Sequence, residues 1–240
     1  MRNLLVSYLE QQKELYGDVP FHISTEEIES FFSEDIDTPI QEIQVKEPPV
    51  YTKTHTSLDA LNNQLQQCRA CGLCEQRSHV VFGSGNPNAD LMIIGEAPGA
   101  EEDKQGLPFV GKAGQLLTKM LSATGFSREE VYIANIVKCR PPNNRDPEQN
   151  EKESCLPFLK QQIQFVQPKM ILSLGRISGQ TLTDISTSLS KLRGQFYTYE
   201  NIELLVTYHP AALLRNPQWK KPVWDDLKKL RYRIDQLKNV

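Results

Sequence analysis

The chain has 240 residues, of which 39% are hydrophobic, and a formal net charge of −3 at pH 7. This length is enough for one large domain with an additional arm, and the hydrophobic content allows a sizeable core. No apolar run is long enough to cross a bilayer and the first residues lack the order of a signal peptide, so we expect a cytoplasmic protein with no membrane partner.

Charge is divided unevenly along the chain. Residues 1–60 carry 4 Lys/Arg and 12 Asp/Glu, whereas residues 61–240 carry 23 and 18. We therefore expect an acidic N-terminal arm over residues 1–55, made of a short amphipathic helix over 3–16 and a linker, followed by a functional domain over residues 56–240. The basic body suits a polyanionic partner, although ordinary surface charge explains this weak excess equally well.

Beyond the arm, Ser57 has the features of an N-cap for a helix through about Gln67. From residue 90 onward, apolar strands alternate with helices. This pattern indicates an α/β fold: a three-layer sandwich with a central, mostly parallel four-stranded sheet flanked by helices. The expected strands cover residues 91–95, 131–139, 169–175, 196–200 and 202–208, and the expected helices cover 113–124, 148–166, 176–184 and 219–237. Ligands bind at the carboxyl ends of strands in such sheets, so the loops that follow them should converge.

Five cysteines in a protein expected to be cytoplasmic favour metal binding over disulfides. Cys68 and Cys71 form a C-x-x-C pair, Cys139 ends an expected strand, and Cys155 lies in the next expected helix. Four thiolates suit zinc or an iron–sulfur cluster, and the wide spacing of the second pair favours the cluster. Cys74 extends the local run to C-x-x-C-x-x-C, so counting leaves the ligand set open; a small buried hydrophobe is the simpler interpretation of Cys74.

Polar and aromatic residues stand at the ends of the expected strands. The GEAPG turn (95–99) can aim backbone N–H groups at an anion or a carbonyl oxygen, or it merely reverses the chain. Phe109, between glycines, is either a core residue or an aromatic that stacks on a planar ring. Asn135 interrupts an apolar strand, so its amide either satisfies the sheet or reads a ligand, since leaving it unbonded costs about 1–3 kcal/mol.

The segment after the last strand allows two interpretations as well. His209 precedes Pro210, which is suited to the first position of a helix, so His209 is a structural cap or a site residue. Leu213 and Leu214 stand beside Arg215, and they are either core residues or a wedge that enters a base stack while the guanidinium holds a phosphate.

Several motifs occur together and in one order over residues 68–230. They are CRAC (68–71), VVFGSGNPNADLMIIGEAPGAEED (80–103), GLPFVGKAGQLL (106–117), VYIANIVKCRPPNNRDP (131–147), SLGR (173–176), LRGQFY (192–197) and TYHPAALLRNP (207–217). With them the chain resembles the family 4 uracil-DNA glycosylases, which are bacterial and archaeal enzymes with an iron–sulfur cluster. The resemblance implies a 4Fe-4S cluster held by Cys68, Cys71, Cys139 and Cys155, without Cys74. It leaves the acidic arm unassigned.

The resemblance also implies an activity: hydrolysis of the N-glycosidic bond of uracil in DNA, which leaves an abasic site for base excision repair. The nucleotide flips out of the duplex. Leu213 or Leu214 fills the gap, while Arg215 and Lys112 contact the DNA. We expect a monomer that takes uracil-containing DNA as its partner.

Inside the implied pocket, Phe109 stacks on the base and Asn135 pairs with O4 and N3–H. His209, near O2, stabilises the charge that grows on the leaving uracil, aided by the GEAPG turn. Ala97 lines the pocket where family 1 enzymes carry an aspartate. Glu96 is therefore the expected group for orienting the water.

Two questions stay open at this point. Glu102 and Asp103 are second choices for orienting the water, and Glu102 is also a candidate for excluding thymine. The alternative functions are a damaged-base or uracil-DNA binding protein without turnover, and a phosphate-ester hydrolase or nucleotide-binding enzyme with zinc in place of iron.

Overall fold

The computed structural model describes residues 57–238. The expected arm over residues 1–55 and its helix over 3–16 lie outside these residues. Within the described part, Ser57 caps the first helix as expected: its side chain accepts a hydrogen bond from the backbone N–H of Ala60. No helix in this part combines the length and the apolar character that a membrane span requires.

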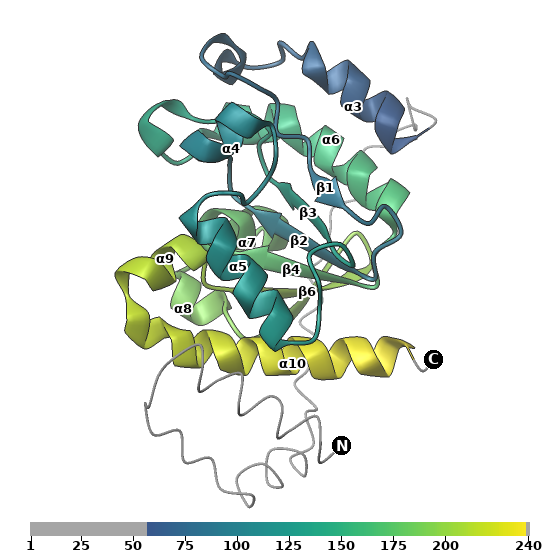
Figure 1. Ribbon diagram of the computed structural model, residues 1–240, viewed down its shortest axis with the longest axis vertical. Coiled ribbons are helices and arrows are strands. Elements are labelled where there is room, and N and C mark those ends of the chain that lie inside the picture. Colours follow the sequence, from purple (N-terminus) through teal and green to yellow (C-terminus); the bar gives the residue numbers. More distant parts are fainter. Residues whose placement is uncertain (1–56, 239–240) are drawn as a thin grey trace, which may run out of the picture. The chain divides into compact units, whose positions relative to one another are not determined.

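A six-stranded sheet organises the molecule, with strand order β1-β3-β2-β4-β6-β5 (Figure 1). The strands are β1 (Ser84–Gly85), β2 (Leu91–Gly95), β3 (Tyr132–Asn135), β4 (Met170–Leu174), β5 (Phe196–Tyr199) and β6 (Ile202–Thr207). The four central strands β3, β2, β4 and β6 run parallel, which confirms the expected parallel core. β1 and β5 add an antiparallel strand at each edge.

Helices connect the strands and cover both faces of the sheet. They are α3 (Leu58–Gln66), α4 (Ala100–Gln105), α5 (Lys112–Ala123), α6 (Gln149–Val166), α7 (Arg176–Thr183), α8 (Leu189–Leu192), α9 (Pro210–Arg215) and α10 (Lys220–Lys238). Short 3₁₀ turns occupy Gly72–Glu75, Pro142–Asn144 and Pro217–Trp219.

Alternation of side chains along the strands divides the core into two clusters, one on each face. Leu91 and Ile93 of β2 pack with Leu117 of α5 and Leu227 of α10. Met92 and its neighbours on the other face pack with α6, α7 and α8. A third, smaller cluster joins α3 to α6. The result is the expected three-layer sandwich (Figure 1).

The segment after β3 departs from the expected strand over 131–139. The strand β3 ends at Asn135, the register partner of Gly95. The N–H of Ile136 donates to Gly95 O at the end of β2, and the N–H of Val137 donates to Glu96 O in the turn beyond it. The chain thus follows that turn out of the sheet toward Cys139.

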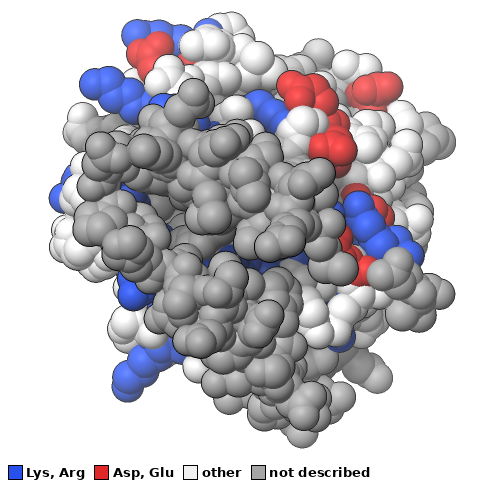
Figure 2. All heavy atoms as spheres, turned by 60° about the horizontal axis from the view of Figure 1, so that its bottom comes forward, with Lys and Arg blue, Asp and Glu red and all other residues white. Residues whose placement is uncertain are grey.

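Charges on the outer side of α10 are mixed. Lys228 pairs with Asp225 and Arg231 pairs with Asp235. Among the described residues visible in Figure 2, Lys and Arg likewise lie next to Asp and Glu. These pairs leave little net charge along this part of α10.

Candidate active site

Three segments converge at the carboxyl ends of β2 and β3. Gly95 and Asn135 are register partners on these two parallel strands. A Cβ atom placed on Gly95 would lie 2.4 Å from Asn135 Oδ1 and 2.7 Å from Phe109 Cζ. Only a glycine therefore lets the Asn135 amide and the Phe109 ring approach this point together.

The Asn135 side chain is 1% exposed, and its Oδ1 has no hydrogen-bond partner among the described residues. A buried acceptor without a donor costs about 1–3 kcal/mol. The backbone oxygen of the same residue is satisfied, because Lys138 Nζ donates to it at 2.8 Å. The unpaired amide oxygen thus marks the place where a ligand donor would bind.

The loop between α4 and α5 holds Phe109 in a left-handed conformation, with φ of 53°. Such a backbone is unusual for an aromatic residue and costs on the order of 1–3 kcal/mol unless its surroundings hold it. Glu102 Oε1 supplies this restraint by accepting from Val110 N and Gly111 N, both at 2.9 Å. Gly114 packs on the other side, where a Cβ would lie 1.8 Å from Phe109 O.

His209 caps α9 and faces Phe109. Its Nδ1 accepts a hydrogen bond from Ala211 N at 3.2 Å, and its ring centroid lies 5.4 Å from that of Phe109. Burial of the ring, aided by Arg215 and opposed by Glu102, lowers the pKa of His209 to about 4. His209 as a whole is only half-buried. The hydrogen bond nevertheless supports a lowered pKa, because a protonated Nδ1 cannot accept a hydrogen bond. The neutral ring therefore carries its proton on Nε2, as a donor.

Glu96 directly follows Gly95 and is half-buried. Burial first, and the charge of Asp146 second, raise the pKa of Glu96 to about 7, while Arg176 and Lys152 act in the opposite direction. A carboxyl group with this pKa changes its charge near neutral pH, as groups at catalytic sites often do. Ala97, next along the turn, packs against the core on the α6 side of the sheet.

The two carboxylates considered as second choices for the water are engaged elsewhere. Glu102 Oε1 holds the Phe109 loop, as described above. Both oxygens of the buried Asp103 accept from Ser78 N, at 2.9 and 3.1 Å. These contacts assign both residues to loop anchoring, which weakens the case for either as the group that orients water.

The expected DNA-contacting residues differ in exposure. Leu213 is 1% exposed and belongs to the core cluster on the α5 and α10 side, whereas Leu214 is 50% exposed. The expectation that either leucine acts as a wedge is thus corrected: only Leu214 is accessible, because the short helix α9 turns Leu213 inward. Arg215 and Lys112 are both exposed.

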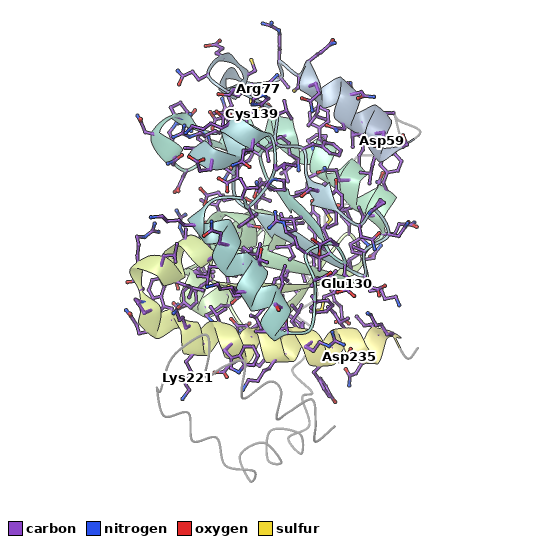
Figure 3. The ribbon with its side chains drawn as sticks, viewed as in Figure 1. Asp59, Arg77, Glu130, Cys139, Lys221 and Asp235 are labelled. Carbon is purple, nitrogen blue, oxygen red and sulfur yellow. The ribbon has the colours of Figure 1, made fainter. Side chains whose placement is uncertain are left out.

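The five cysteines line one cavity at the α3 end of the described domain, together with Arg77 and Lys138. Arg77 donates to Cys139 Sγ at 3.2 Å and to Cys68 O at 2.8 Å, and Figure 3 shows Arg77 beside Cys139. No cluster of three or more His, Cys, Asp or Glu in the described part is placed to hold a single metal ion. The thiols nevertheless line one cavity, and such a donor set suits a metal centre held by cysteines.

Burial raises the pKa of Cys155 to about 12, and burial also raises the pKa of Cys71 and Cys139. Metal binding would therefore displace thiol protons. The cations of Arg77 and Lys138 provide the compensating charge that such thiolates need. One indication of this charged cavity was overlooked in the sequence: Lys138, a charged residue that ends an otherwise apolar run.

Residues 82–228 match the family model of the uracil DNA glycosylase superfamily. The chain belongs to this superfamily. It is similar to three type-4 uracil-DNA glycosylases in particular. The identities are 45% with that of Sulfurisphaera tokodaii (73% of this chain, 84% of the relative), 42% with that of Archaeoglobus fulgidus (72% and 92%) and 39% with that of Thermotoga maritima (76% and 96%).

A type-5 uracil-DNA glycosylase of Pyrobaculum aerophilum is 30% identical and covers 54% of this chain. The type-4 enzymes thus match over more of the chain and at higher identity. The comparison confirms the resemblance to family 4 that the sequence motifs indicated. For a uracil-DNA glycosylase superfamily member, the cluster of Gly95, Phe109, Asn135 and His209 is the natural candidate for the active site.

Proposed function

We propose that this protein is a uracil-DNA glycosylase, which hydrolyses the N-glycosidic bond of uracil in DNA and leaves an abasic site. The observation that carries the proposal is the buried, unpaired Oδ1 of Asn135, which lies beside Phe109. An amide oxygen accepts from N3–H of uracil while the amide nitrogen donates to O4. Cytosine presents the reversed pattern, so the same amide rejects it.

The remaining pocket residues account for the reaction. The base must leave the stack, since the enzyme cannot reach it inside a duplex. Phe109, held by Glu102, stacks on the flipped ring. His209, neutral and with Nε2–H as a donor, stabilises the negative charge that develops on O2 as the bond breaks. Glu96 in its ionised form orients the water that adds to the sugar.

Leu214 is proposed as the wedge that fills the gap in the stack, with Arg215 beside it on the phosphate backbone. Both are exposed at the end of α9, the helix that His209 caps. Lys112, exposed at the start of α5, is a further proposed phosphate contact. These roles place the DNA along the ends of α5 and α9, two helices that contact one another.

We further propose that Cys68, Cys71, Cys139 and Cys155 hold a 4Fe-4S cluster. The shared cavity and the cations in its wall support this assignment. When bound, the cluster supplies a structural cross-link between the 68–71 segment, the end of the β3 segment and α6. Cys74 lines the same cavity and is left outside the proposed ligand set.

The test is a uracil-release assay on single-stranded and duplex oligonucleotides, using protein purified and kept without air. We expect free uracil and an abasic site, with no release from matched thymine or cytosine substrates. Iron and sulfide are assayed on the same samples. Intact DNA in the presence of a fully loaded cluster would refute the activity, and tight retention of uracil-DNA without free base would identify a binding protein instead.

Asn135→Asp tests how the pocket selects its base. A carboxylate has no donor for O4, so the preference for uracil over cytosine, as a ratio of kcat/KM values, should fall by about 100-fold or more. The exposed Asn88→Asp is the matched control and should behave as the wild type. Unchanged discrimination in the Asn135 variant would remove this residue from its assigned role.

A further inference from the structure

Lys138 is 1% exposed, and it is the only buried lysine among residues 57–238. Its Nζ donates to Asn135 O at 2.8 Å. No carboxylate within the described residues forms an ion pair with it. Removing an ammonium group from water costs several kcal/mol unless an anion or several acceptors compensate it, so one backbone oxygen alone is a poor environment.

The cysteine cavity would provide the missing anions once a bound metal group displaces the thiol protons. Lys138 lies in the wall of that cavity, and its electrostatic neighbours are the sulfurs of Cys155 and Cys139. Lys138 therefore lies between the cysteine cavity and the backbone of Asn135. On one side it faces the thiols, and on the other it fixes the backbone of the residue whose amide is proposed to read the base.

We propose that Lys138 is a positioning residue that joins the cysteine cage to the base pocket. With a cluster bound, its charge would compensate the thiolates of Cys139 and Cys155, while its hydrogen bond fixes the backbone of Asn135. This restraint keeps the Asn135 amide aligned although its Oδ1 has no partner of its own. The inference rests on the proposed glycosylase activity and cluster, and it adds a residue that connects them.

Arg77 provides a matched comparison. It is the other cation that contacts the cage, through Cys139 Sγ and the backbone oxygens of Cys68 and Gln66, and it makes no contact with β3 in the described structure. Removing either cation should affect the cluster. Only removal of Lys138 should also affect the choice of base.

The experiment compares wild type, Lys138→Met, Lys138→Gln and Arg77→Met as full chains prepared without air. Iron content and the reduction potential of the cluster are measured first. KM and kcat on uracil-DNA, and the preference for uracil over cytosine, follow. Losing a nearby positive charge makes it harder to add an electron, so the potential should become more negative in all three variants.

The variants should differ in their kinetics. A hydrogen bond to a charged group is worth about 1.5–3 kcal/mol, so Lys138→Met should lower kcat/KM on uracil-DNA by about 10-fold or more and weaken discrimination. Lys138→Gln keeps a donor for Asn135 O and should retain most of the wild-type discrimination. Arg77→Met should discriminate as the wild type does.

Two results would overturn the proposal. One is a loaded Lys138→Met protein with wild-type discrimination. The other is an unchanged reduction potential in Lys138→Gln, and this result decides the matter if the methionine variant does not fold. A wild-type protein without iron or without uracil release would instead refute the proposed function, so the two failures are distinguishable.

Discussion

At the residue scale, a candidate site residue stands out in the sequence where the chemistry of its side chain conflicts with its surroundings. Asn135 in an apolar strand is such a conflict, and the structure leaves its Oδ1 buried and unpaired. Leu213 and Leu214 carry no such signal, because two adjacent leucines look alike until the helix fixes which one points inward. Lys138 shows such a conflict, since it is a charged residue in an apolar run. Its role depends on Cys155 in α6, which only the fold brings close.

Glu96 should give the reaction its pH dependence. Its pKa is raised to about 7, so the carboxyl group is protonated below pH 7 and ionised above it. If the ionised form orients the water, kcat/KM should rise between pH 6 and 8 and then level off. Glu96→Gln should be about 10- to 100-fold slower and lack this rise.

Asp146→Asn tests whether the charge of Asp146 helps to raise the pKa of Glu96. Asp146 is the second contribution that raises the pKa of Glu96, so its removal should move the rise in kcat/KM to lower pH. A flat wild-type profile from pH 6 to 8 would contradict the role of Glu96.

His209 should act in the transition state more than in binding. Because its pKa is lowered to about 4, the ring stays neutral above pH 5 and adds no transition near pH 6.5. His209→Ala should lower kcat by about 100-fold or more while KM changes only a few-fold. His79→Ala, at an exposed histidine that pairs with Asp103 O, is the control and should stay close to wild type. A change confined to KM would mean that His209 only binds.

At the scale of single elements, the parallel arrangement of the central strands follows from the alternation of strands and helices, whereas the strand order does not. The length of β3 could not be predicted, because Ile136 and Val137 are as apolar as the strand, yet Val137 bonds to Glu96 in the turn after β2. The short helix α4 was not expected either. Its importance lies in Glu102, which holds the backbone of the next loop.

Glu102 offers a test of that loop. Glu102→Ala leaves the N–H groups of Val110 and Gly111 without their acceptor, and each lost bond costs about 1–3 kcal/mol. Phe109 should then leave its left-handed backbone, and kcat/KM should fall by about 10-fold or more. Glu102→Gln keeps an acceptor and should retain most activity. Glu101→Ala, at an exposed neighbour that pairs only with Lys104 among the described residues, is the control. Wild-type activity in Glu102→Ala would show that Glu102 is not needed to hold Phe109 in place.

At the scale of the whole described domain, the three layers and the parallel core were predictable because the apolar pattern specifies which faces are buried. Buried networks of charged residues could not be predicted, because the residues that form them are distant in sequence. Asp226 of α10 is 1% exposed and accepts from Thr207 Oγ1 at 2.6 Å and Arg193 Nε at 3.0 Å. This network fastens the end of β6, two residues before His209, to the last helix.

Asp226 should therefore matter for stability. Asp226→Ala leaves Arg193 and Thr207 without their acceptor, and we expect the free energy of unfolding to fall by about 3 kcal/mol. Asp225→Ala, which removes only a partly exposed pair with Lys228, should cost less than about 1 kcal/mol. Denaturant titration of loaded protein measures both. Equal midpoints for the two variants would show that the buried network contributes little.

The unpaired Oδ1 of Asn135 should also affect how the product leaves the site. Because the amide sits at a strand end rather than on a free loop, it cannot swing toward water once the base has gone. If Asn135 binds the base as proposed, its Oδ1 is again left without a donor each time the excised base departs. The enzyme should accordingly part from its product slowly and be slowed by uracil that accumulates around it.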